Sequence, residues 1–507
     1  MDLNDGPFAA SAREDATLRS FAPETRAGTS PKKNQQEGHM RHHRLIATSS
    51  LVLSAAVLAA SATGAAAWQN PLKNPYVKGK LNICDQGSFF VGGVPKVTNY
   101  ASSSTAGAPQ QITIGQMYVQ FQIPDKRRQW PLIIMHGSSH TGACLEATPD
   151  GREGWLPYAL RKYNLSMFIV DQPGRGRSGF DQSVIQEGLG TNNLSLIPTN
   201  WGRITDNGAW TSWFGHLLPA GSDIVTGKLI RHGDPGDPDP PEDFSNPSEA
   251  HGKYPPAFPI PPRPNSVDLK VVSRVGAIGP APNPANNTYL GLEYYKQLVP
   301  NAEVTLPTSQ CASCTPTTVS GLNTFGPRAL ADLIEGLGGA VLSGHSQAAN
   351  PLLHTIRYLK EDDAWGKCGP KGACLAMLKG MVIPEGAGFS PDGLTQAGLV
   401  GKDFDKIPFL LVNGDYRPLA TRLGNRQARD IINASKTRSV GPALVLDTEL
   451  ISPKFNGQTH MNMIGFTNLE LFDFIMAWAD KNIKNPILRN HCENDDDDDD
   501  DHGHGHH

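Results

Sequence analysis

The chain has 507 residues, of which 38% are hydrophobic and 19% are charged, and its formal net charge at pH 7 is −4. These values are ordinary for a soluble globular protein with at least one large core, and they exclude a chain that is disordered throughout. Seven of the negative charges lie in Asp495–Asp501, so the rest of the chain is close to neutral, which argues against nucleic acid as a partner.

Residues 40–67 have the parts of a secretory signal peptide. The basic start Met40-Arg-His-His-Arg precedes an apolar run, residues 45–62, and small residues follow it. This pattern predicts cleavage after Ala67 and a secreted or periplasmic protein. Residues 1–39 are then an upstream misread start or a short extra leader. The alternative is that residues 45–62 form a membrane anchor, which their length and their alanine and serine content disfavour.

Strand and helix signals alternate through the first part of the chain that follows. Residues 116–123 alternate between polar and apolar side chains, as a half-buried strand does. Residues 131–137 and 165–174 are continuous apolar runs ended by turn residues, which is typical of strands covered on both faces of a parallel sheet. Residues 154–163, between these two runs, are predicted to form a helix.

Residues 181–324 break this pattern. They are rich in proline, glycine and asparagine, and stretches such as GDPGDPDPPEDF cannot sustain a helix or a strand. We interpret the region as a mostly irregular insertion or lid over the sheet, with a short helix over residues 287–299; an interdomain linker is the alternative. Its aromatic residues are expected to form a small core of the lid or to line an acyl or aryl pocket: Trp201, Trp210, Trp213, Phe214 and Tyr289.

The remaining part of the chain returns to alternating strands and helices. Four strand candidates lie within residues 338–344, 379–386, 407–415 and 441–450, and a helix is predicted over residues 468–483. Repeated strand, helix, strand units predict a doubly wound, mostly parallel α/β sheet. In such sheets the functional sites lie at the carboxyl ends of the strands.

The sequence Gly344-His-Ser-Gln-Ala348 fits a nucleophile elbow that has alanine in place of the final glycine. Small flanking residues allow a tight turn that lifts the serine side chain above the sheet. The pattern predicts that Ser346 is a nucleophile, with an incidental turn as the alternative. A helix is predicted to follow over residues 348–359, broken or kinked near Pro351.

A serine nucleophile needs a histidine base and backbone donors for the oxyanion. His460 follows the last strand candidate and precedes the final helix, which makes it the predicted base; a structural loop histidine is the alternative. The main-chain N–H groups of Ser138 and Gln347 are the predicted oxyanion donors. The alternative for His136-Gly137, beside Ser138, is ordinary turn chemistry at a strand end.

The carboxylate that orients the histidine has two candidates. Glu385 ends the strand after the nucleophile helix, and Asp415 ends the next strand. Both could reach His460, because adjacent strands lie about 4.8 Å apart. We choose Glu385, whose longer side chain can span from the earlier strand, and we keep Asp415 as the alternative acid.

Residues 136–179 contain the blocks HG-x-x-x-TG, TPDGR-x-GW and DQ-x-GRGRS, and GDY and GQTHMNMI follow further along. With these blocks the sequence resembles a group of exported microbial α/β-hydrolases related to bacterial carboxylesterases. The resemblance covers about residues 86–483 outside the insertion. It implies the α/β-hydrolase fold, ester hydrolysis, and a triad on Ser346, Glu385 and His460.

The chain departs from this pattern in one place. Some members of the group have adjacent cysteines after the HG, where this chain has Ser138-Ser139. A vicinal disulfide near the oxyanion site is therefore absent. We predict a secreted serine esterase that works through an acyl-enzyme; the alternatives are an acyltransferase or peptidase on the same triad, or a catalytically inactive binding protein with this fold.

Seven cysteines behind an export signal predict loop disulfides with one cysteine left over. Two pairs are close in sequence, Cys311 with Cys314 and Cys368 with Cys374, and the connectivity stays open. The spacing around Cys311 fits neither a zinc site nor a thioredoxin-like motif.

The whole chain is then divided as follows. The hydrolase domain spans residues 68–493, and residues 494–507 form a disordered Asp/His tail, with weak binding of divalent metals as the alternative for the tail. We expect no cofactor and no metal centre. The expected partner is a small-molecule ester, no membrane span is expected after processing, and the oligomeric state is left open.

Overall fold

The computed structural model describes residues 71–149, 151–197, 294–301, 325–414, 419–456 and 458–488, together with residues 203, 204, 209, 213 and 417. All of them belong to the compact unit Gly64–His507. The predicted signal peptide, most of the predicted insertion and the acidic tail lie outside the described residues.

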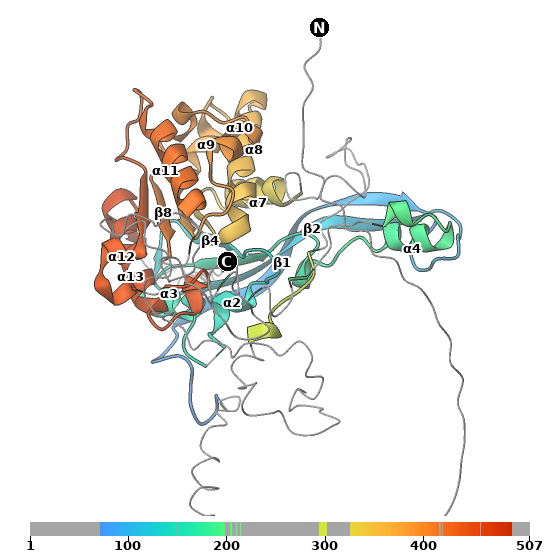
Figure 1. Cartoon of the computed structure of the whole chain (residues 1–507), viewed down its shortest axis with the longest axis horizontal. Helices are drawn as coiled ribbons and strands as arrows, with labels where there is room; N and C mark the ends of the chain where they lie inside the picture. The colour runs from blue at the N-terminus through green and yellow to red at the C-terminus, as the bar shows by residue number, and fades with distance from the viewer. Residues whose placement is uncertain are drawn as a thin grey trace, which may run out of the picture. The chain divides into compact units, whose positions relative to one another are not determined.

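Eight strands form one sheet in the order β1-β2-β5-β4-β6-β7-β8-β9 (Figure 1). The first two pairs, β1-β2 and β2-β5, are antiparallel. All pairs from β5-β4 to β8-β9 are parallel, as the apolar runs predicted. The strands are β1 (Ile83–Thr98), β2 (Gln110–Pro124), β4 (Leu132–Met135), β5 (Met167–Asp171), β6 (Ala340–Gly344), β7 (Leu378–Pro384), β8 (Phe409–Asn413) and β9 (Leu444–Asp447). The short strands β3 (Arg127–Arg128) and β10 (Ile487–Leu488) pair with each other in a separate sheet.

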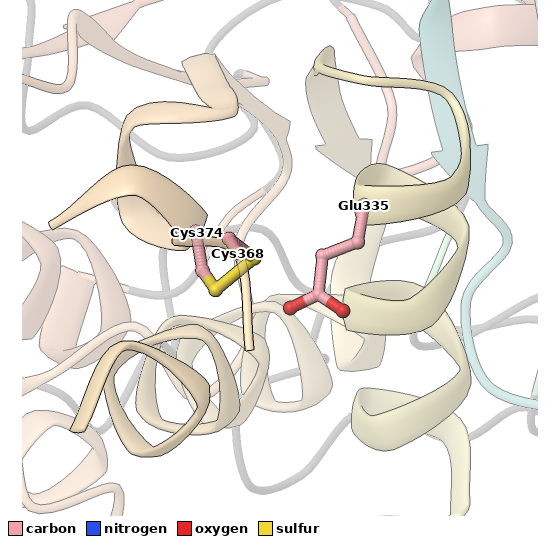
Figure 2. Close-up of side chains that lie close together, drawn as sticks. All are labelled: Glu335, Cys368 and Cys374. Carbon is pink, nitrogen blue, oxygen red and sulfur yellow. A yellow bond between two sulfur atoms is a disulfide. The ribbon is translucent and has the colours of Figure 1, made fainter. Parts of the chain in front are cut away.

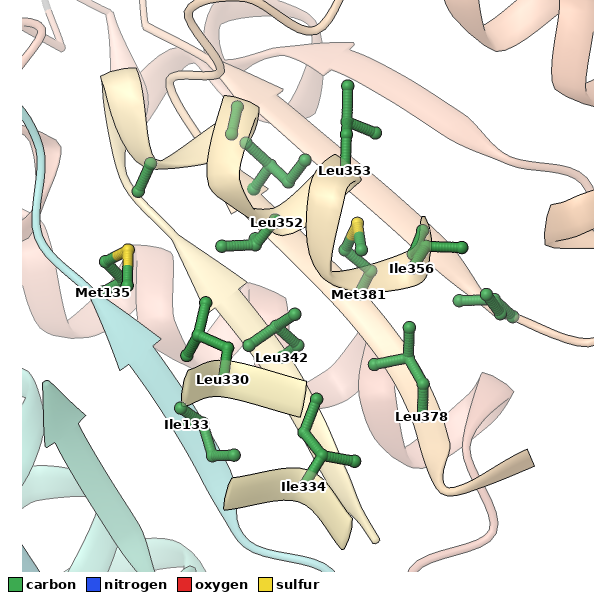
Figure 3. Close-up of a cluster of buried hydrophobic side chains, with 14 of the residues drawn as sticks. Ile133, Met135, Leu330, Ile334, Leu342, Leu352, Leu353, Ile356, Leu378 and Met381 are labelled. Atoms are coloured by element: carbon green, nitrogen blue, oxygen red, sulfur yellow. The ribbon is translucent and has the colours of Figure 1, made fainter. Parts of the chain in front are cut away.

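Helices cover both faces of the sheet. Successive residues of a strand point to opposite faces, so in β4 Ile133 and Met135 join one buried cluster and Leu132 and Ile134 join the other. Figure 3 shows the first cluster, where strand side chains meet those of α7 and α8. The helices on that face are α7 (Phe325–Gly336), α8 (Ala349–Trp365), α9 (Ala373–Ala376), α10 (Pro391–Gln396) and α11 (Leu419–Asn433), and those on the other are α2 (Ala143–Glu146), α3 (Trp155–Tyr163) and α13 (Asn468–Asn482).

The helix after Ser346 differs from the prediction. We expected a break or kink near Pro351, but α8 runs without interruption from Ala349 to Trp365. Pro351 stands in the first turn, where a residue has no N–H acceptor within the helix, so its missing N–H costs nothing.

The start of the predicted insertion also differs from the expected irregular chain. Helix α4 (Ser183–Gly190) forms there and lies beside the far end of the β1–β2 hairpin (Figure 1). A buried ion pair between Lys96 of β1 and Asp181 fixes the chain at that point, with Nζ and Oδ2 2.6 Å apart. Helix α12 (Thr448–Ile451) follows β9.

Disulfides are present, as the cysteine count predicted. Cys368 and Cys374 are bonded to each other, Cys84 is also disulfide-bonded, and Cys144 is free and buried. Glu335 of α7 approaches the Cys368–Cys374 bridge (Figure 2). Because both sulfur atoms are used in the disulfide, they are not thiolates, and this group of side chains is not a metal site.

None of the helices in the described ranges is long and apolar enough to cross a membrane. The possible anchor at residues 45–62 falls outside those ranges.

Candidate active site

Ser346 stands at the sharp turn between β6 and α8. Its φ is +56°, a left-handed conformation that non-glycine residues adopt at a cost of roughly 1–3 kcal/mol. The turn is tight: a Cβ on Gly344 would lie 2.8 Å from Leu352 Cδ1 and 2.9 Å from Ala348 Cβ. A glycine is therefore required at 344, and the small Ala348 fits where a larger side chain would press the turn open.

Three of the predicted site residues meet at the carboxyl end of the sheet. The Ser346 Oγ–H donates to His460 Nε2 at 2.8 Å, and His460 Nδ1 lies 2.8 Å from Glu385 Oε2. A carboxylate only accepts, so Nδ1 carries the ring proton and Nε2 is free to accept from the serine. Asp415, the alternative acid, lies outside the described residues.

Glu385 is held by the strand beside its own. It directly follows β7 with a φ of +59°, and its second oxygen, Oε1, accepts from the N–H of Gly414, which directly follows β8. A Cβ on Gly414 would lie 2.6 Å from that oxygen, so a side chain there would displace the carboxylate. Complete burial raises the pKa of Glu385, while the positive charge of Arg417 lowers it.

The segment after β4 presses against the nucleophile. A Cβ on Gly137 would lie 2.9 Å from Ser346 Cβ, so the backbone of Gly137, the residue before Ser138, lies against the serine. Ser138 and Gln347 both keep partial exposure while their neighbours in sequence are buried. Asn301, which lies within the predicted insertion, donates from Nδ2 to Ser138 Oγ at 3.2 Å and accepts the Ser139 N–H at 2.9 Å.

His136 in the same segment is held in one neutral form. Its Nδ1–H donates to the Gly137 carbonyl at 2.8 Å, and its Nε2 accepts the Gln172 N–H at 3.0 Å. Burial lowers the pKa of His136 to about 4. Both ring nitrogens are hydrogen-bonded to backbone groups, so His136 holds the conformation of the turn after β4.

Comparison with known proteins adds to this geometry. No protein-family model matches the chain. A protein of Fungal sp. (strain ATCC 74256) named "Probable secreted lipase phiG" is 30% identical over 121 residues, 24% of this chain and 30% of that protein. The chain thus spans under a third of this curated relative. The solved structure of a novel bacterial esterase superposes with a TM-score of 0.52 at 25% identity, over 80% of this chain and 98% of that one.

The chain has the α/β-hydrolase fold. The fold class expected from the sequence is therefore confirmed. In this fold the side chains of the candidate site come from the loops after β6, β7 and β9, at the edge where the strands end.

Two backbone contacts hold the loop that carries His460, and the sequence predicted neither. The Nε2–H of His345 donates to the His460 carbonyl at 2.8 Å, and the His460 N–H donates to the Trp213 carbonyl at 3.1 Å. Burial lowers the pKa of His345 to about 3, which keeps this donor neutral. Trp213 is one of the aromatic residues that we expect in a lid core or an acyl pocket. Its ring centroid lies 5.0 Å from that of His140 and 6.1 Å from that of His460. The other aromatic residues of that expectation lie outside the described residues.

Arg417 is a charged neighbour of the site that sequence reasoning missed. It is buried, with Nε 3.7 Å from Glu385 Oε2 and Nη1 3.2 Å from His460 Nδ1. Since Nδ1 carries a proton, Arg417 cannot donate to it and acts there through its charge. Burial and then this charge lower the pKa of His460 well below its ordinary value. The only sequence signal was its place just after GDY, one of the matching motifs.

Proposed function

We propose that this protein is a serine hydrolase that cleaves carboxylic esters through an acyl-enzyme intermediate. The observation that carries the proposal is the hydrogen-bonded line from Ser346 through His460 to Glu385, with 2.8 Å at each step. The likeness to a bacterial esterase and to a secreted lipase supports ester hydrolysis as the reaction class.

In the proposed mechanism Ser346 Oγ attacks the ester carbonyl carbon while His460 Nε2 takes the hydroxyl proton. Glu385 keeps the proton on Nδ1 and stabilises the imidazolium that forms. The carbonyl oxygen becomes an oxyanion that accepts from the N–H groups of Ser138 and Gln347. His460 returns the proton to the leaving alcohol, and water then repeats the sequence on the acyl-enzyme to release the acid.

The direct test is hydrolysis of p-nitrophenyl acetate and butyrate combined with covalent labelling by a fluorophosphonate. We expect turnover with an initial burst of p-nitrophenol, and a phosphonyl mass shift on the peptide that contains Ser346. A protein that folds but neither turns over nor takes the label would overturn the proposal. Label on another serine would overturn the assignment of Ser346.

The same residues could serve acyl transfer or peptide cleavage. Adding a primary alcohol to the assay distinguishes a transferase, because its acyl-enzyme would give the new ester faster than the free acid. A p-nitroanilide substrate identifies a peptidase, because a peptidase would cleave its amide bond. We expect hydrolysis of the ester to exceed both, and a panel varying acyl length and alcohol bulk then defines the substrate.

We expect the activity to persist into mildly acidic conditions. His460 must be neutral to accept the serine proton, and its pKa is lowered by burial, so the neutral base survives below pH 6.5, the ordinary histidine pKa. The acid limb of kcat/KM against pH should therefore have its midpoint below 6.5. A midpoint above this value in the free enzyme would show that the site stabilises the imidazolium instead.

We also propose export, with residues 1–67 removed and residues 68–493 forming the hydrolase domain. The signal-peptide pattern of residues 40–67 motivates this, and the disulfides and the naming of one relative as secreted agree with it. Amino-terminal sequencing of secreted protein should begin at or near Trp68. Recovery of the protein only from the cytosol, with its leader intact, would contradict the prediction.

A further inference from the structure

The motif DQ-x-GRGRS, residues 171–178, has no part in the mechanism above, yet it ties together the loops around Ser346. Asp171, at the end of β5, accepts the Gly142 N–H on Oδ1 at 2.7 Å and the Arg177 N–H on Oδ2 at 3.0 Å. Gln172 Nε2 donates to the His136 carbonyl at 2.7 Å. The motif is thereby fastened to the segment that carries Ser138.

Arg175 is the member of the motif that reaches the site itself. Its side chain is buried, and Nη1 donates to the Gly137 carbonyl at 3.0 Å. His136 Nδ1–H donates to the same oxygen at 2.8 Å. In a trans peptide the C=O and the following N–H point in opposite directions. Two donors on the Gly137 oxygen therefore orient the Ser138 N–H away from Arg175.

The other end of the same guanidinium reaches the nucleophile elbow. Arg175 Nη2 donates to Gln347 Oε1 at 2.6 Å, and Gln347 supplies the second oxyanion N–H of the proposed mechanism. A planar guanidinium presents its donors in a fixed fork, so it sets the spacing of the two groups that it binds, which a lysine ammonium cannot do.

We propose that Arg175 is the positioning residue of the oxyanion hole, joining the Gly137–Ser138 peptide to Gln347 through one guanidinium. This inference rests on the proposed function, since it assigns a role within that site. The charge-assisted hydrogen bond from Arg175 to the Gly137 carbonyl also polarises the peptide, which strengthens the Ser138 N–H as a donor.

The charge of Arg175 favours the same role. Burial lowers the pKa of Arg175 to about 9, which leaves the side chain cationic at neutral pH. A fixed positive charge one peptide unit behind the donor stabilises a negative oxygen more in the transition state than in the bound ester.

The test compares Arg175→Gln and Arg175→Lys with Arg177→Gln as a matched control. The Arg177 guanidinium belongs to the same motif but pairs with Asp171 Oδ1 and Oδ2 and with Gln120 Oε1. Measured quantities are kcat and KM for p-nitrophenyl acetate, and Ki for a trifluoromethyl ketone, which forms a tetrahedral oxyanion on a serine nucleophile. Thermal midpoints report whether each variant is folded.

We expect Arg175→Gln to lower kcat by about 10²–10³, the effect of losing one oxyanion donor, with KM changed by less than about threefold. Ki for the ketone should rise by a similar factor, because the ketone uses the same donors. Arg175→Lys keeps the charge but not the forked pair of donors. Its kcat and its Ki for the ketone should lie between those of the unmodified protein and those of Arg175→Gln. Arg177→Gln should stay within about threefold of the unmodified protein in all three quantities.

The inference is overturned if Arg175→Gln has the kcat of the unmodified protein, or if Arg175→Gln and Arg177→Gln lower kcat by the same factor. It is also overturned if Arg175→Gln lowers kcat while its Ki for the ketone is unchanged. If Arg175→Gln fails to fold, the ketone Ki of Arg175→Lys decides: an unchanged value overturns the role, and a raised one supports it. A failure of the proposed function is distinguishable, because the unmodified protein would then show neither turnover nor ketone inhibition.

Discussion

Replacement of Ser346 by alanine is expected to lower kcat for p-nitrophenyl acetate by about 10⁶, the loss seen when the nucleophile of a serine hydrolase is removed. The reason is that no other hydroxyl is hydrogen-bonded to His460 Nε2 among the described residues. Alanine keeps the Cβ and the backbone of the turn, so the fold should be retained. Steady-state rates, corrected for spontaneous hydrolysis, give the comparison.

Ser343→Ala is the matched control for this experiment. Ser343 lies in β6, is buried, and carries a hydroxyl that has no part in the proposed mechanism. Its removal should leave kcat within about threefold. Equal rates for Ser346→Ala and the unmodified protein would eliminate the serine mechanism, whatever the cause of the turnover.

Replacement of Glu385 by glutamine is expected to lower kcat by about 10⁴, by the precedent of the serine protease triad. Glutamine has nearly the same size but no charge, so it neither stabilises the imidazolium nor enforces the proton on Nδ1. The buried environment magnifies the loss, because water cannot replace the missing charge.

Asp415→Asn is the companion experiment, since Asp415 is the other candidate acid. With Glu385 hydrogen-bonded to both His460 and Gly414, we expect Asp415→Asn to lower kcat by no more than roughly tenfold. The reverse ranking of the two variants would assign the acid to Asp415. Circular dichroism of both variants checks that the fold is intact.

Much of the sheet could be predicted because its central strands are short apolar runs ended by turn residues. Strand β1 could not. It contains Gly92 and Gly93, with φ of +70° and +90°, and Pro95, which together read as a turn. They are tolerated because β1 is an edge strand that pairs only with β2, where proline and kinked glycine are acceptable.

Some residues of the candidate site could likewise be predicted from the sequence, and others could not. Ser346, His460 and Glu385 could be proposed from local motifs, since each follows a recognisable strand or precedes a recognisable helix. Arg175 and Asn301 could not be given roles, because their contacts cross the chain. Arg175 and Gln347 are 172 residues apart, and Asn301 and Ser138 are 163 apart. A local pattern marks the loops, but which loops meet depends on the order of strands in the sheet.

The positive φ angles of Ser346 and Glu385 have a consequence for the evolution of such a chain. Each of these angles lowers the stability of the folded state by roughly 1–3 kcal/mol, whereas a glycine adopts the same angle without strain. Part of this advantage of glycine is lost because an unfolded chain with glycine has more conformational entropy. Selection for thermal resistance alone should therefore enrich glycine at position 346, whereas selection for ester turnover should exclude it. Under the proposed function the nucleophile stands at a strained backbone position, and a lineage that lost catalysis would be free to gain stability there.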